Sequence, residues 1–180
     1  MEFVEPIRNA KKVKEIGEYI RNKNGEKYDW LYSIGIYSGL RISDILTLKV
    51  KDVKQKRSIK IREKKTGKER YFPINPELKL LINKYCINKH DNEYLFHNRN
   101  GNPISRQYAY RIIHEAGLKN GIDHLGTHTL RKTFGYHFYT QKKDIVLLQK
   151  ILNHKDPSIT LRYIGIEQDT INQAMSHFHY

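Results

Sequence analysis

The sequence predicts an α+β domain that is mainly α-helical, a helical bundle with one small antiparallel β-hairpin. Apolar residues recur at helical spacing along most of the 180 residues, and one short stretch alternates as a hairpin does. No repeat, low-complexity tract or interdomain linker interrupts the chain. A chain of this length can bury one substantial core but has no room for two large domains. Residues 1–180 are therefore expected to form a single domain.

The first predicted helices begin that core. Residues 9–22 place apolar side chains on one face and are followed by the stop signal Asn24-Gly25. Residues 27–38 are apolar nearly all round, which predicts a buried helix that ends at Gly39. Residues 40–48 read as a further apolar helical run.

A strongly basic hairpin is predicted next. Between residues 49 and 70, eleven Lys and Arg residues stand against three acidic ones. Residues 58–62 alternate as a strand, residues 70–74 supply its partner, and residues 64–68 form the turn. Such a hairpin can follow a phosphate backbone or enter a groove of DNA. The alternative is an edge hairpin that its lysines keep in solution.

Capping residues mark the starts of the remaining helices, namely Asn75-Pro76, Ser105, Thr127, Asp144 and Asp156-Pro157. The first of these helices should run to about Lys89 and the second to about Gly117. The tail, about residues 167–178, carries one apolar stripe on a short helix. Because so short a helix is marginal by itself, the stripe needs a surface to dock on, and a groove of its own domain is one option.

Two pairs of residues indicate phosphate binding. His128 and Arg131 lie three apart at a helix start, where a guanidinium, an imidazole and the helix N-terminus all suit an anion. Arg41 lies between two apolar segments, where a charge needs a partner, and Asp44 could hold its guanidinium in one orientation. A solvated basic face and a purely structural Arg–Asp pair are the alternatives.

Charge and cysteine content narrow the class of protein. Lys and Arg outnumber Asp and Glu by 33 to 19, a net charge of +14, which favours polyanionic partners. The alternative is a basic protein without a nucleic-acid role. The single Cys86 cannot form an internal disulfide. Neither a signal peptide nor a run of about 18 apolar residues is present, so we expect no membrane role and a cytoplasmic, nucleoid-associated protein.

Five short motifs occur in a characteristic order: Gly39-Leu40-Arg41-Ile42-Ser43-Asp44, Lys65-Thr66-Gly67-Lys68, His128-Thr129-Leu130-Arg131, Leu152-Asn153-His154 and Leu161-Arg162-Tyr163. Together they resemble the catalytic domain of the tyrosine recombinases, the phage-integrase family. The resemblance runs from about Pro6 to about Ser176. It implies the tyrosine-recombinase catalytic fold and a site-specific recombinase or integrase that cleaves and rejoins DNA through a 3′-phosphotyrosyl intermediate.

The resemblance implies that Tyr163 is the nucleophile. The chain has 13 tyrosines, and composition alone cannot say which of them is the nucleophile. Only Tyr163 follows the His154 turn at the spacing found in the family. Tyr136 and Tyr139 are rivals by proximity to the central helix, but their aromatic neighbours suggest packing.

The resemblance also assigns the charge clamp. Arg41 and Arg131 would hold the non-bridging oxygens of the phosphate, as bidentate guanidinium groups do well. Asp44 would orient Arg41 without touching the substrate. With these charges in place, the resemblance implies catalysis without a metal or another cofactor.

The family pattern gives proton-transfer or hydrogen-bonding roles to three further residues. Lys65 at the hairpin tip would protonate the departing 5′ oxygen, with Lys64 and Lys68 as its rivals. His128 would accept the tyrosine proton or hydrogen-bond the phosphate, and His154 would donate one more hydrogen bond.

The implied partner is double-stranded DNA, bound by a dimer or tetramer on paired sites. The residues expected to contact DNA outside the catalytic set are Lys60, Lys64, Lys68, Arg106 and Arg111. The tail helix would then be exchanged between protomers. A type IB topoisomerase-like relaxing activity and a DNA-binding module that no longer cuts are the alternatives. Most integrases carry an N-terminal DNA-binding domain, so this chain is expected to be a fragment or a short form without it.

Overall fold

The computed structural model describes residues 4–62 and 67–177, which form a bundle of helices with a two-stranded antiparallel sheet. This confirms the predicted fold class. The elements in chain order are α1 (Ala10–Asn24), α2 (Glu26–Ser38), α3 (Ile42–Ile45), α4 (Val50–Val53), β1 (Ser58–Arg62), β2 (Glu69–Pro73), α5 (Pro76–Tyr85), α6 (Arg106–Lys119), α7 (Thr127–Lys142), α8 (Ile145–Leu152), α9 (Pro157–Tyr163) and α10 (Ile166–Ser176).

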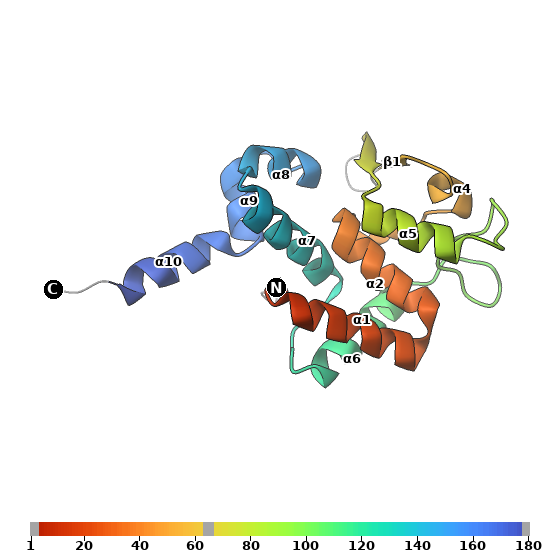
Figure 1. Cartoon of the computed structure of the whole chain (residues 1–180), viewed down its shortest axis with the longest axis horizontal. Helices are drawn as coiled ribbons and strands as arrows, with labels where there is room; N and C mark the ends of the chain where they lie inside the picture. The colour runs from red at the N-terminus through yellow and green to blue at the C-terminus, as the bar shows by residue number, and fades with distance from the viewer. Residues whose placement is uncertain (1–3, 63–66, 178–180) are drawn as a thin grey trace.

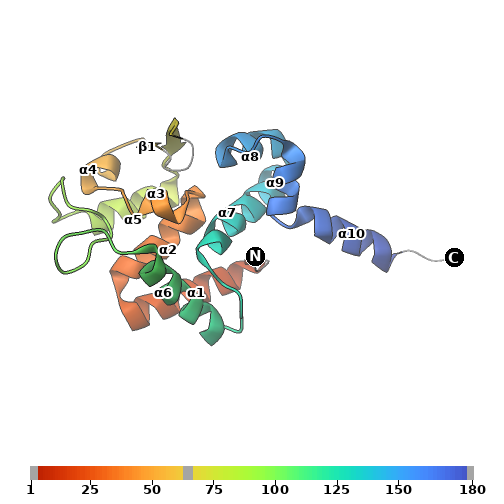
Figure 2. The ribbon, with the colours of Figure 1, turned by 180° about the vertical axis from the view of Figure 1, so that it is seen from behind.

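Helix α7 lies between two groups of elements (Figure 1). Helices α1 to α6 and the hairpin form the larger group, while α8, α9 and α10 form the smaller one, and the view from behind shows the same division (Figure 2). Leu130, near the start of α7, packs into the core of the larger group, and Phe134, one turn later, packs against the core of the smaller group. One helix therefore belongs to both hydrophobic cores.

The predicted hairpin forms with Ser58 opposite Pro73 and Arg62 opposite Glu69. Ile59 and Ile61 are buried on one face, and Lys60 between them is exposed, as the alternation predicts. The predicted turn residues Lys64 and Lys65 lie outside the described residues.

Four of the predicted helix caps are confirmed. The side chains of Asn75, Ser105, Asp144 and Asp156 each accept a hydrogen bond from a backbone N–H in the first turn of the helix that follows. Each satisfies one of the amide donors that a helix start leaves without a partner inside the helix.

Thr127 is not the cap that we predicted. Gly126 occupies the N-cap position of α7, and Thr127 is the first helical residue. The reason is Thr129, whose buried hydroxyl accepts a hydrogen bond from the Gly126 N–H at 3.0 Å and so fixes the entry of the chain one residue earlier. His128 and Arg131 still lie in the first two turns.

Two predicted helical runs are shorter than expected because tertiary hydrogen bonds compete with them. In the segment 40–48 only the four residues of α3 are helical. The end of the segment bonds elsewhere in the fold, because Leu48 O accepts a hydrogen bond from Leu95 N at 2.9 Å. Helix α5 ends at Tyr85 rather than near Lys89. There, Lys54 Nζ donates to Lys89 O at 3.3 Å and holds the chain in a turn.

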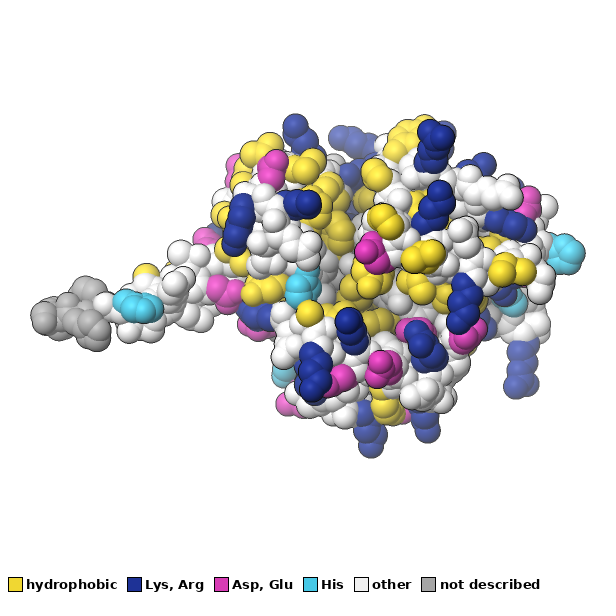
Figure 3. All heavy atoms as spheres, in the orientation of Figure 1, with side chains coloured by type: hydrophobic (Ala, Val, Ile, Leu, Met, Phe, Trp, Pro, Cys, Tyr) yellow, Lys and Arg dark blue, Asp and Glu magenta, His cyan; other side chains and the backbone are white. Residues whose placement is uncertain are grey.

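A hollow lies between α7 and the larger group, with hydrophobic side chains visible inside it (Figure 3). Its volume is about 400 Å³, and its wall includes Val13, Ile36, Phe134 and Phe138. Helix α10 projects away from the rest of the chain (Figure 1), and none of its residues is buried.

Helices α2 and α7 approach each other closely at Gly35. A Cβ atom placed there would lie 2.6 Å from Leu130 Cδ1 and 3.0 Å from Leu130 Cβ, well inside ordinary contact. At Gly39, which ends α2 with φ of 63°, a Cβ atom would likewise meet the ring of Phe134. The absence of a side chain at these positions lets the two helices touch.

We predict that Gly35→Ala lowers the free energy of unfolding by about 1–3 kcal/mol, because overpacking forces the helices apart. In an ordinary helix interior the same change would stabilise by about 1 kcal/mol. Denaturant unfolding measures the effect. In a Leu130→Ala background, Gly35→Ala should no longer destabilise, and equal losses in both backgrounds would contradict the packing argument.

Candidate active site

A basic pocket of about 680 Å³ opens at the start of α7. Arg41, the N-cap residue of α3, lies in its wall together with His128 and Arg131 of α7. Arg106, the first residue of α6, completes the positive lining. Two segments distant in the sequence therefore bring two predicted catalytic arginines and a predicted catalytic histidine to one pocket, and a third segment adds Arg106, as an anion site requires.

Arg131 is the most buried of these cations, with a relative exposure of 3%. Its Nη1 donates to Gly39 O at the end of α2, and its Nη2 donates to Leu152 O at the end of α8. Its positive charge also acts on the phenol of Tyr163 and opposes the rise in the pKa of that group. One charged group thus contacts both halves of the fold, lines the pocket and acts on the predicted nucleophile.

Tyr163 is the last residue of α9 and is partly buried. Burial raises the pKa of its phenol, while the positive charges of Arg131 and Arg41 oppose that rise. The phenol is therefore protonated at rest near neutral pH, beside two cations that stabilise its anion.

His154 is fixed beside Tyr163. The two rings meet edge to face with centroids 5.0 Å apart. His154 Nδ1 lies 3.0 Å from the hydroxyl of Thr160, a fully buried residue of α9, and Gln149 Nε2 donates to His154 O at 3.0 Å. The contacts with Thr160 and Tyr163 constrain the ring, and the bond from Gln149 holds the backbone of the turn between α8 and α9.

His128 is an exposed residue of the pocket wall, yet its pKa is lowered. The largest cause is partial burial of the ring, followed by the positive charges of Arg106, Arg131, Lys132 and Arg41. A neutral imidazole that can accept a proton is therefore the dominant form at neutral pH.

Asp44 is buried, with 2% exposure, one turn after Arg41. Its backbone N–H donates to Arg41 O at 2.9 Å, and its carbonyl accepts from the Thr47 hydroxyl at 2.7 Å. The two residues are thus held in one tight turn, and the orienting role of the carboxylate stays a prediction.

The other predicted residues differ in their surroundings. Lys65 and Lys64 lie outside the described residues. Lys60 pairs with Glu69 at 3.2 Å, and Lys68 is exposed. Arg111 lies over the ring of Tyr108 at 4.9 Å. Arg106, predicted only as a DNA contact, lines the basic pocket together with the predicted catalytic residues Arg41 and His128.

The rival tyrosines pack as the sequence suggested. Tyr136 and Tyr139 are partly buried against the core that contains Leu148, Leu152 and Ile164.

Three relevant residues were missed by the sequence analysis. Lys132 Nζ lies 5.2 Å from the centroid of the Tyr163 ring, and Thr160 supports His154. Arg70 Nη2 donates to Lys150 O at 2.6 Å and to Ile151 O at 2.9 Å, which ties β2 to α8. The only signal in the sequence for any of these contacts was that Lys132 directly follows the predicted catalytic Arg131.

Within the described ranges, no three His, Cys, Asp or Glu side chains lie together as a metal site would need. None of the helices in that part of the chain has the length and hydrophobicity of a membrane span.

The fold and this arrangement of Arg, His and Tyr define a tyrosine recombinase catalytic domain. Residues 9–169 match the model of the phage integrase family, and the chain belongs to that family. It is 51% identical to the probable integrase/recombinase YoeC of Bacillus subtilis, over 99% of this chain and 98% of that protein.

Longer relatives match over part of their length. Tyrosine recombinase XerD of Halalkalibacterium halodurans is 27% identical, over 79% of this chain and 50% of its own. Tyrosine recombinase XerA of Pyrococcus furiosus is 32% identical, over 77% of this chain and 50% of its own. The chain therefore spans about half the length of these two recombinases.

Solved structures share the fold. The crystal structure of XerA recombinase superposes with a TM-score of 0.77 at 23% identity, over 99% of this chain and 68% of that one. A lambda integrase dimer bound to a COC' core site gives a TM-score of 0.72 at 16% identity, over 91% of this chain and 49% of that one.

We predict that His128 titrates below the ordinary value of 6.5 in an NMR titration of the free protein. Arg106→Gln should raise this midpoint, because it removes the largest of the charge effects that disfavour the imidazolium. Arg111→Gln, which removes a cation outside that set, is the control and should change nothing. A wild-type midpoint above 6.5 would contradict the electrostatics described here.

Proposed function

We propose that the protein is a site-specific DNA recombinase or integrase that cleaves and rejoins double-stranded DNA through Tyr163. One observation carries the proposal: Arg131 lies in the basic pocket and bonds Leu152 O at the end of α8, next to the turn whose His154 packs against Tyr163. A nucleophile beside a phosphate clamp is the arrangement that phosphoryl transfer to tyrosine needs. The relatives named integrase and recombinase support the same reaction.

The proposed cleavage step exchanges one phosphate ester for another. The Tyr163 oxygen attacks phosphorus, the bond from phosphorus to the 5′ oxygen breaks, and a 3′-phosphotyrosyl ester forms. The phenol proton goes to His128, whose lowered pKa keeps it neutral and able to accept. By the family pattern Lys65 gives a proton to the leaving 5′ oxygen, and His154 donates a hydrogen bond to the phosphate. The reverse sequence rejoins the strand.

Arg41 and Arg131 supply the charge that the transition state needs. The phosphorane carries its extra negative charge on the non-bridging oxygens, and two guanidinium groups in one wall of the pocket can each donate to them. Asp44 orients Arg41. We propose on this basis that the reaction needs neither a metal ion nor another cofactor, and that it takes place at the nucleoid.

We predict that Tyr163→Phe abolishes the covalent adduct on nicked DNA while DNA affinity stays near wild type. The phenyl ring keeps the packing against His154 but has no attacking oxygen. Gel mobility of the denatured protein–DNA adduct measures the effect, and Tyr136→Phe is the matched control. An adduct that survives in Tyr163→Phe and disappears in Tyr136→Phe would transfer the role to Tyr136.

The same assay separates the alternatives. A DNA-binding module that does not cut would give no adduct with the wild-type protein. A relaxing activity of the topoisomerase kind would give an adduct without requiring paired sites. Chelation by EDTA should leave adduct formation unchanged, and a loss that magnesium restores would refute the metal-independent mechanism.

We propose further that a dimer or tetramer assembles on paired DNA sites through exchange of the tail helix α10. The apolar side chains of Ile171 and Met175 are 51% and 65% exposed, and α10 buries none of its residues on its own chain. An exposed apolar stripe on a projecting helix is suited to a neighbouring protomer. The structure described as a lambda integrase dimer on DNA supports such an assembly.

We predict that Ile171→Ser combined with Met175→Ser prevents assembly on paired sites without lowering the thermal midpoint, because neither side chain is buried in the single chain. Sedimentation of the protein with a two-site DNA measures assembly. Gln168→Ala combined with Asn172→Ala changes polar residues of the same helix and is the control. Assembly at wild-type concentrations by the serine variant would contradict tail exchange.

A further inference from the structure

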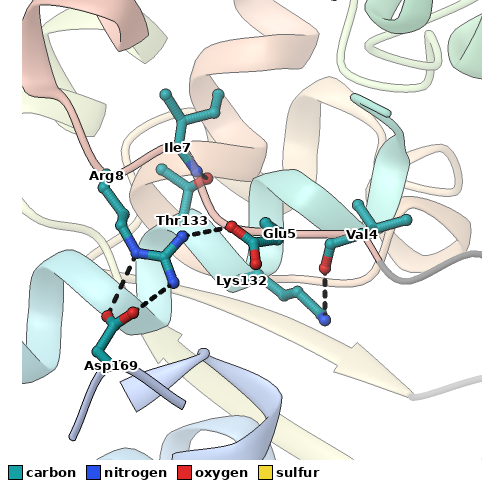
Figure 4. A network of polar contacts seen from close by, with 7 residues as sticks. All are labelled: Val4, Glu5, Ile7, Arg8, Lys132, Thr133 and Asp169. Carbon is teal, nitrogen blue, oxygen red and sulfur yellow. Dashed lines mark hydrogen bonds and ion pairs between the residues drawn. The ribbon is translucent and has the colours of Figure 1, made fainter. Parts of the chain in front are cut away.

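The N-terminal strap, residues 4–8, crosses α7 in extended conformation (Figure 4). Its Val4 carbonyl accepts a hydrogen bond from Lys132 Nζ at 2.6 Å. Its Ile7 N–H donates to the buried hydroxyl of Thr133 at 2.9 Å, and the Ile7 carbonyl lies 2.9 Å from His137 Nε2. Three hydrogen bonds therefore hold the strap along one side of α7.

The strap also reaches the segment that follows Tyr163. Arg8 donates to both carboxylate oxygens of Asp169 in α10, at 2.8 Å and 3.2 Å, and to Glu5 at 2.6 Å. Gly165, two residues after Tyr163, lies so close that a Cβ atom there would be 3.0 Å from Arg8 Nη2. The strap thus contacts α7 and, through Arg8, the helix α10 that follows Tyr163 (Figure 4).

Lys132 connects the strap to the nucleophile itself. Its ammonium group binds Val4 O and lies 5.2 Å from the centroid of the Tyr163 ring, within cation–π range. The pKa of Lys132 is lowered because the side chain is partly buried, and the negative charge of Glu5 in the strap opposes this shift. The neighbouring Arg131 carries a positive charge that opposes the rise in the pKa of the Tyr163 phenol, so consecutive residues of α7 act on this side chain, Lys132 by direct contact with its ring.

We propose that Lys132 is a positioning residue for Tyr163 and that the strap holds Lys132 in place through Val4. This inference rests on the proposed role of Tyr163 as the nucleophile. A phenol whose ring can swing carries its hydroxyl group with it, and a contact on the ring restricts the line along which the oxygen meets phosphorus. Since in-line attack tolerates little misplacement, losing this contact should slow cleavage by about tenfold.

The test is the single-turnover rate of adduct formation on nicked DNA at saturating protein. Lys132→Met keeps the length of the side chain but removes both the charge and the hydrogen bond. We expect its rate to fall about tenfold, with the half-saturating DNA concentration unchanged, and Lys132→Arg to recover most of the loss. Lys143→Met is the matched control, because Lys143 lies over the ring of Tyr139, 5.6 Å from its centroid, and should leave the rate unchanged.

A double-variant cycle tests the route through the strap. Deletion of residues 1–5 removes Val4 but keeps Lys132, and should slow adduct formation to the same degree. Combining the deletion with Lys132→Met should add no further loss, because both act through one contact. Thermal midpoints show whether each variant folds, and if Lys132→Met does not fold, the deletion alone decides.

The outcomes separate this inference from the proposed function. Wild-type rates in Lys132→Met or in the folded deletion would overturn the inference, as would a multiplicative loss in the combined variant or an equal loss in Lys143→Met. In each of these cases Tyr163→Phe would still abolish the adduct. An adduct that persists in Tyr163→Phe would instead refute the nucleophile.

Discussion

The buried guanidinium of Arg131 is the constraint on which the rest of the structure depends. A charge with 3% exposure is costly unless its donors are satisfied, and its partners come from opposite sides of α7. The Gly39 and Leu152 carbonyls belong to helix C-termini, where acceptors lack a partner inside the helix and carry partial negative charge. Arg131 satisfies two such ends at once, and folding both halves against α7 therefore also assembles the site.

The turns that end these helices make this possible. Gly39 and Asn153 both adopt the left-handed conformation, with φ of 63° and 52°, so each helix stops where its carbonyl points at α7. Next to these turns lie residues of the site itself, Arg41 after Gly39 and His154 after Asn153. Each turn thus has two effects: it presents a carbonyl acceptor to Arg131, and it places the next predicted catalytic residue, Arg41 or His154, close to that arginine. This explains why motifs far apart in the sequence lie together in the fold.

Local signals predicted much of this fold, and tertiary contacts account for what they missed. Caps such as Asn75 and Asp144 act within one turn, so the sequence alone located those helix starts. The end of α5 and the cap of α7 depend on partners elsewhere in the fold, such as the contact of Lys54 with Lys89. For the site, the order of motifs indicated Arg41, His128 and Arg131, whereas the pocket position of Arg106 depends on how α6 packs beside α7.

The cations of the pocket act on two protons in a complementary way. Arg131 and Arg41 lower the pKa of His128 and also oppose the rise in the pKa of Tyr163, so their field brings the acceptor to its neutral form and eases loss of the phenol proton. In the proposed mechanism a bound phosphate offsets part of this field, which raises the basicity of His128 but also removes part of the charge that stabilises the phenolate of Tyr163. Because these two effects oppose each other, the proposed proton transfer depends on Arg131 and Arg41 acting on the Tyr163 oxygen while they also hold the phosphate.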